Sequence, residues 1–206
     1  MDKRLLVSTV LVFLLIGLFF FVEKDSITNY PPKGDTILVF GDSLVSGVGA
    51  SEGKNFVSLL GASLKKPVLN LGVPGDTTQS ALIRIGESLE LKPDIVLVLL
   101  GGNDALKKIP KEETEQNLIS IVQKFQSGGA VVVVLGVRGG LLGDPYSSMY
   151  ERITKVTGSI LVPDVLDDIF GDMRYMSDAI HPNNAGYERI AVRIIPILRE
   201  LVNDSL

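Results

Sequence analysis

Two uninterrupted apolar runs constrain the fold of this chain more than any other feature. Residues 95–100 and 130–135 contain only Ile, Val, Leu and Ala. A strand with one face in water alternates apolar and polar residues, whereas a strand covered on both faces is apolar throughout. These runs therefore predict parallel strands that are buried between two layers of helices.

Strand and helix patterns alternate along the rest of the chain. We expect strands near residues 36–40, 67–71, 94–100, 130–136 and 160–162. Helical patterns lie between and after them, near residues 54–65, 77–90, 112–127, 145–157 and 184–203. Right-handed crossovers place such helices on both faces of a parallel sheet. The predicted fold class is α/β, a three-layer α/β/α sandwich around a parallel five-stranded sheet.

The amino terminus contains a separate apolar segment. Residues 5–22 form an uncharged run of 18 residues directly after Lys3 and Arg4. As a helix this run covers about 27 Å, close to the roughly 30 Å of bilayer hydrocarbon. A cleaved signal peptide has a shorter apolar region and a small-residue cleavage site, which this segment lacks. We expect an uncleaved transmembrane anchor in residues 1–25, with secretion after cleavage as the alternative.

The charge of the flanking residues predicts the orientation of this anchor. Lys3 and Arg4 should stay in the cytoplasm by the positive-inside rule, so the domain after the anchor would be extracytoplasmic. Residues 26–35 include two prolines and a glycine and indicate a short linker. Residues 36–206 are then one domain of about 170 residues, which is long enough to form its own core.

Composition excludes several function classes. The net charge is -4 and no cluster of Lys and Arg is present, which argues against binding to nucleic acid. The chain has no cysteine, so disulfides, lipid attachment at cysteine and thiolate chemistry are all excluded.

The only histidine, His181, is the one candidate for imidazole acid-base chemistry near neutral pH. Asp178 precedes it by three positions. A carboxylate that binds one ring nitrogen leaves the other nitrogen free to take a proton, as in a catalytic triad. The alternative is a histidine with a surface or capping role.

A serine at a predicted strand end is the candidate nucleophile. Ser43 follows the apolar run 36–40 in Gly41-Asp42-Ser43-Leu44. In open α/β sheets, ligands bind where the strands end at their carboxyl termini. Asp42 and Ser43 could instead cap a helix. The G-x-S-x-G motif of α/β-hydrolases is absent, because Val45 occupies the position of its second glycine.

Two more strand-end segments extend this pattern. Gly75-Asp76-Thr77 and Gly102-Asn103-Asp104 follow two further predicted strands, although each alone could be an ordinary turn or helix cap. With Gly41-Asp42-Ser43-Leu44 and the segment from Asp178 to His181, these blocks resemble the SGNH (GDSL) hydrolase family in their order and approximate spacing. The resemblance covers roughly residues 36–201. It is strongest to the branch containing bacterial lysophospholipase L1, acyl-CoA thioesterase I and arylesterases.

The resemblance implies a flavodoxin-like SGNH-hydrolase fold and a role for each block. Ser43 would be the nucleophile, His181 the general base and then acid, and Asp178 the group that orients His181. The N–H groups of Ser43 and Gly75 and the side-chain amide of Asn103 would form the oxyanion hole. Fixed donors of this kind stabilise the charge of the transition state, and losing one costs on the order of 3 kcal/mol. No metal or organic cofactor is implied.

The loop at residues 136–146 departs from the family pattern, because it is rich in glycine and leucine. Such a loop could be a lid over an acyl chain or simply a flexible connection. Candidate substrate contacts are placed here and beside the nucleophile: Asp42, Leu44, Arg138, Leu141 and Leu142.

The leading interpretation is a membrane-tethered serine esterase. Its substrate would be a small-molecule or lipid ester of the lysophospholipid, acyl thioester or aryl ester class, cleaved through an acyl-enzyme on Ser43. A cell-envelope carbohydrate O-deacetylase of the same fold is an alternative, as is a catalytically silent binding domain. Metal-dependent phosphoester hydrolysis is less consistent with the chain, since its single histidine and scattered carboxylates show no recognised ligand spacing. The oligomeric state is left open.

Overall fold

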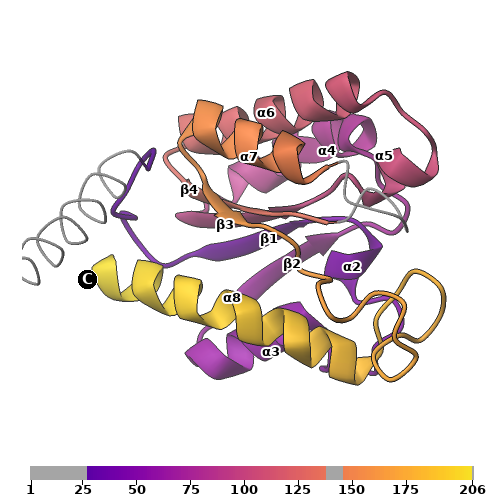
Figure 1. Ribbon diagram of the computed structural model, residues 1–206. Helices are drawn as coiled ribbons and strands as arrows, with labels where there is room; N and C mark the ends of the chain where they lie inside the picture. The colour runs from indigo at the N-terminus through magenta and orange to yellow at the C-terminus, as the bar shows by residue number, and fades with distance from the viewer. Residues whose placement is uncertain (1–26, 138–145, 206) are drawn as a thin grey trace, which may run out of the picture.

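The protein folds around one parallel five-stranded sheet, as the apolar runs predict. The structure is a computed structural model that describes residues 27–137 and 146–205. The strands lie in the order β2-β1-β3-β4-β5 and all neighbours are parallel (Figure 1). Their bounds are β1 (Ile37–Gly41), β2 (Val68–Gly72), β3 (Ile95–Leu99), β4 (Val131–Leu135) and β5 (Ile160–Val162).

Helices cover both faces of the sheet and complete the predicted three layers (Figure 1). One face carries α3 (Phe56–Leu64) and α8 (Asn184–Asp204). The other carries α4 (Thr78–Glu90), α6 (Lys111–Ser127) and α7 (Ser147–Thr157). Two short helices were not predicted, namely α2 (Ser43–Ser46) directly after β1 and α5 (Gly102–Leu106) after β3.

The core lies on both sides of the three central strands. Every residue of β1, β3 and β4 is buried, which explains why these strands show no alternation of apolar and polar residues. On the face covered by α6, the rings of Phe40 and Phe125 meet edge to face with centroids 5.4 Å apart. On the opposite face, Phe56 stacks on Tyr187 of α8 at 6.4 Å.

The described part of the predicted linker is bonded to the amino-terminal edge of the sheet. The Thr28 N–H donates to the Gly158 carbonyl at 2.8 Å, just before β5. The Asn29 amide donates to the Ala130 carbonyl at 3.0 Å, just before β4. Residues 27–35 therefore follow the surface of the domain up to the start of β1.

Within residues 27–137 and 146–205, no helix is long and apolar enough to cross a membrane. The segment for which the sequence predicts an anchor, residues 5–22, lies outside the described residues.

Truncating the buried ring of Phe125 should destabilise the domain strongly. Phe125→Ala removes the edge contact with Phe40 and leaves a cavity under α6, so we expect about 3–5 kcal/mol less free energy of unfolding. Ile83→Ala is the control, because Ile83 is 82% exposed. Urea unfolding measures both values, and equal stability of the two variants would contradict this view of the core.

Candidate active site

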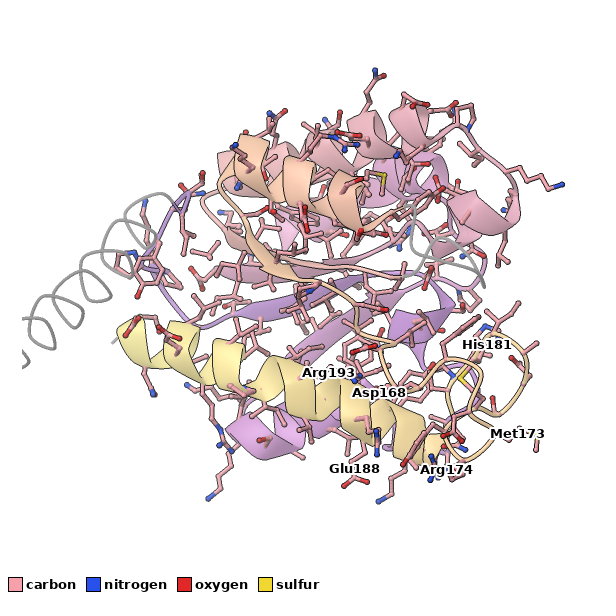
Figure 2. The ribbon with its side chains drawn as sticks, viewed as in Figure 1. Asp168, Met173, Arg174, His181, Glu188 and Arg193 are labelled. Atoms are coloured by element: carbon pink, nitrogen blue, oxygen red, sulfur yellow. The ribbon has the colours of Figure 1, made fainter. Side chains whose placement is uncertain are left out.

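The residues that the sequence singles out gather at the carboxyl-terminal edge of the sheet. Gly41 is the register partner of both Gly72 and Leu99, so the segments that leave β1, β2 and β3 begin side by side. Ser43, Gly75 and Asn103 lie on these three segments. A fourth segment, the loop before α8, brings His181 to the same edge (Figure 2).

Ser43, His181 and Asp178 form a continuous chain of hydrogen bonds. His181 Nε2 lies 3.1 Å from Ser43 Oγ, and His181 Nδ1 lies 2.8 Å from Asp178 Oδ2. A carboxylate can only accept, so the proton of the neutral ring belongs on Nδ1. Nε2 is then free to accept the serine proton. The structure thus brings these three predicted residues into the order that nucleophilic catalysis requires.

Asp178 is itself held in place by the backbone. Its Oδ1 accepts the N–H groups of Ile180 and His181, both at 2.7 Å. The hydrogen bond from the His181 ring, followed by these two backbone bonds, lowers the pKa of Asp178 to about 2. The carboxylate therefore stays ionised at neutral pH and can stabilise an imidazolium.

The loop after α2 is bonded to the beginning of α8, which fixes the serine segment against the histidine segment. The Ser51 N–H donates to Asn184 Oδ1 at 2.8 Å, and the Tyr187 hydroxyl donates to the Val48 carbonyl at 2.8 Å. Asn183 caps α8 by accepting from the N–H groups of Ala185 and Gly186. Both sides of the Ser43–His181 bond are therefore anchored to the same helix.

Two backbone N–H groups at the site have no acceptor among the described residues. They belong to Ser43, at the start of α2, and to Gly75, in the turn after β2. Gly75 has φ +84, and a Cβ added there would meet nothing within 4 Å. Glycine is therefore favoured at this position by the left-handed backbone rather than by crowding.

The side-chain amide of Asn103 lies at the site but already has two acceptors. Its Nδ2 donates to the backbone carbonyl of Asp76 at 2.9 Å and to Asp42 Oδ2 at 3.2 Å. An amide nitrogen has two hydrogens, so both are engaged in this state. A further acceptor must share one of these hydrogens or replace a present partner.

The structure does not support Asp42 and Leu44 as substrate contacts. Asp42 is 2% exposed and caps α2 by accepting the Leu44 N–H at 3.0 Å. Leu44 is 6% exposed and belongs to the core. Packing of α2 over the sheet buries both. Burial also raises the pKa of Asp42 to about 7, against the effect of the Leu44 N–H bond. The remaining predicted contacts, Arg138, Leu141 and Leu142, lie outside the described residues.

An ion pair beside the site was missed from the sequence. Asp76 Oδ2 binds Arg84 Nε at 2.6 Å, and Asp76 Oδ1 accepts the Ser80 hydroxyl at 2.8 Å. Asp76 lies just before α4, and Ser80 and Arg84 follow it at intervals of four residues on one face of that helix. The spacing of four residues could have indicated this contact, but it matches no known sequence motif.

A buried carboxylate, Asp104, was also assigned no role. It is fully buried and accepts the N–H and the hydroxyl of Thr78, the latter at 2.5 Å. Asp104 thereby joins the start of α4 to α5, the helix that carries Asn103.

The described residues contain no group of three His, Asp or Glu side chains that could hold a metal ion.

Comparisons with known proteins agree with this geometry. Residues 39–189 match the model of the GDSL-like Lipase/Acylhydrolase family. The chain is 32% identical over 179 residues to Esterase TesA of Pseudomonas aeruginosa, covering 81% of this chain and 89% of the relative. It is also 32% identical over 178 residues to Thioesterase 1/protease 1/lysophospholipase L1 of Escherichia coli (strain K12), covering 82% and 86%.

A solved structure shares the arrangement of the chain in space. The crystal structure of TesA superposes with a TM-score of 0.75 at 33% identity, covering 81% of this chain and 99% of the TesA chain. The family match includes more than half of the chain, with Ser43, Gly75, Asn103, Asp178 and His181 inside it. The chain therefore belongs to the GDSL-like lipase/acylhydrolase family and is a serine hydrolase of the SGNH type.

Proposed function

We propose that this enzyme hydrolyses carboxylic esters through an acyl-enzyme on Ser43, with His181 as general base and acid and Asp178 as the orienting carboxylate. The observation that carries the proposal is the hydrogen-bonded chain from Ser43 Oγ to His181 Nε2 and from His181 Nδ1 to Asp178. The relatives' names, esterase and thioesterase/lysophospholipase, support an acyl substrate that is an ester or thioester.

In the first half of the reaction, Ser43 Oγ attacks the substrate carbonyl carbon while its proton passes to His181 Nε2. The carbonyl becomes a tetrahedral oxyanion. When it collapses, the bond to the leaving oxygen or sulfur breaks and His181 gives its proton to that atom, leaving the acyl group on Ser43. In the second half, a water molecule attacks the acyl carbon while its proton passes to His181 Nε2. When the second tetrahedral intermediate collapses, the bond to Ser43 Oγ breaks and His181 returns the proton to Ser43 Oγ. The carboxylic acid leaves and Ser43 is restored.

The proposed oxyanion hole consists of the N–H groups of Ser43 and Gly75 and the Asn103 amide. The two backbone donors have no other acceptor among the described residues. The Asn103 amide must redirect one hydrogen, and its longer bond, 3.2 Å to Asp42, is the one more readily exchanged.

We propose further that residues 5–22 remain as a membrane anchor with the domain on the extracytoplasmic side. If so, the domain sits close to the bilayer, because residues 27–35 are bonded to the amino-terminal edge of the sheet. Ser43 lies at the opposite edge, beyond the five residues of β1. Those residues extend roughly 17 Å. The anchor would therefore hold Ser43 away from its own membrane.

This placement favours esters that approach from outside the anchoring bilayer. A cell-envelope carbohydrate O-acetyl ester fits that direction, which makes O-deacetylation the second candidate function. Lysophospholipids would need to leave the membrane to reach Ser43. Much faster hydrolysis of acetyl esters than of long-chain esters would favour a carbohydrate O-acetyl ester over a lipid ester as the substrate.

Removing the nucleophile tests the proposed mechanism. Ser43→Ala should lower kcat on 4-nitrophenyl butyrate roughly 10⁴-fold or more, because no oxygen remains to be acylated. Ser46→Ala is the matched control on the same helix. It loses only the bond from its hydroxyl to the Ser43 carbonyl and should stay within a few-fold of the parent activity. Unchanged hydrolysis by Ser43→Ala would rule out the acyl-enzyme.

Asn103→Ala should reduce kcat about 10²- to 10³-fold with little change in KM, because the amide would bind the oxyanion and not the ground-state ester. Steady-state kinetics measures both values, and circular dichroism checks that the variant is folded. A rise in KM at constant kcat would instead assign Asn103 to substrate binding.

The anchor can be tested on full-length protein expressed in bacteria. We expect it in the membrane fraction, released by detergent but not by high salt, with an intact mass that still includes residues 1–25. Protease added outside the cytoplasmic membrane should digest the domain. A soluble product that lacks this segment would show that it is a cleaved leader.

A further inference from the structure

One guanidinium outside the proposed catalytic residues binds two of the backbone segments that form the site. Arg84 of α4 donates through Nε to Asp76 Oδ2 at 2.6 Å. Its Nη2 donates to the carbonyl of Gly41 at 3.0 Å and to the carbonyl of Leu71 at 3.0 Å. The same guanidinium lies over the ring of Phe40, 4.2 Å from its centroid.

Each of these contacts lies close to a proposed oxyanion donor. Gly41 is the last residue of β1, two positions before Ser43. Leu71 lies near the end of β2, in the strand that leads to Gly75. Asp76 follows Gly75 directly, and its carbonyl accepts the Asn103 amide at 2.9 Å. Arg84 thus joins the segments that carry Ser43 and Gly75, and the second of these segments accepts the Asn103 amide.

The chemistry of the contact requires arginine. The Asp76 side chain is 9% exposed and that of Arg84 is 25% exposed, so the pair is largely shielded from water. Only a planar guanidinium can direct separate N–H groups at a carboxylate and at two carbonyls in one plane. Lysine would keep the charge, but its three N–H donors lie on a single nitrogen, which cannot take the places of both Nε and Nη2.

We infer that Arg84 is a positioning residue for the oxyanion hole. It fixes the end of β1 relative to the end of β2, so that the N–H groups of Ser43 and Gly75 and the Asn103 amide point at one place. This inference rests on the proposed function. A displacement of about 1 Å at a reacting centre can cost on the order of 100-fold in rate. Bonds from Arg84 that hold the ends of β1 and β2 in place would therefore affect kcat.

The test compares Arg84→Met and Arg84→Lys with Arg152→Met in the full-length protein in detergent. Arg152 is the matched control, because it also forms a two-bond pair with a carboxylate, Glu115, at 3.0 and 2.6 Å. That pair joins α7 to α6 on the surface. Loss of Arg152 removes an ion pair without touching β1, β2 or the turn after β2.

We expect kcat on 4-nitrophenyl butyrate, per folded molecule, to fall about 100-fold in Arg84→Met and about 10-fold in Arg84→Lys, with KM within about threefold of the parent value. The rate of inactivation by a fluorophosphonate should fall in parallel, since its adduct uses the same donors. Arg152→Met should keep the parent kcat. If Arg84→Met does not fold, Arg84→Lys decides the outcome.

The inference is overturned if folded Arg84→Lys keeps the parent kcat and inactivation rate, or if the loss is confined to Tm or KM. The proposed function is judged separately by Ser43→Ala. If Ser43→Ala is inactive and the Arg84 variants are fully active, the proposed esterase function stands and the proposed role of Arg84 is rejected.

Discussion

The 3.1 Å hydrogen bond between Ser43 and His181 joins segments 138 residues apart, and much of the structure serves to hold its two ends in place. Ser43 is fixed because β1 is buried along its whole length and because Asp42 caps the short helix that begins at the serine. His181 is fixed by Asp178 and by the start of α8, which also binds the loop after α2 through Asn184 and Tyr187. The bond is therefore preorganised by packing on both sides.

Buried polar groups form the second framework of the site. Asp104 binds Thr78, Asp76 binds Arg84, and Asp42 binds the Leu44 N–H and Asn103. In the described part of the chain, no buried side-chain nitrogen or oxygen lacks a hydrogen-bond partner. An unpaired buried carboxylate would destabilise the fold. Because each of these carboxylates is bonded, the buried polar network also makes the loops of the site rigid.

Much of the fold could be predicted because the sheet is buried on both faces. The apolar runs place β1 to β4 within one residue of their observed bounds, and the range predicted for the last strand, 160–162, coincides with β5. Helices α2 and α5 escape such prediction, because four or five residues show no helical period. Their first residues are also the site motifs, since α2 begins at Ser43 and Asn103 is the second residue of α5.

The candidate site also contains some residues that the sequence could single out and others that only the packed structure shows. Ser43, Gly75, Asn103, Asp178 and His181 lie in short motifs, so the sequence could single them out. The burial of Asp42 and Leu44 could not be predicted, since it depends on how α2 packs over the sheet. Arg84 was missed because one charge on an amphipathic helix is usually exposed. Only the packed structure shows it bonded to Gly41 and Leu71.

The chemical reactivity of Ser43 tests the proposed mechanism most directly. Full-length protein is treated with a fluorophosphonate, its intact mass is measured, and the adduct is located by peptide mapping, with His181→Ala treated in parallel. We expect one adduct, on Ser43, that forms at least about 100-fold more slowly without the imidazole. Folded protein without an adduct, or with an adduct that forms equally fast in His181→Ala, would contradict an activated serine.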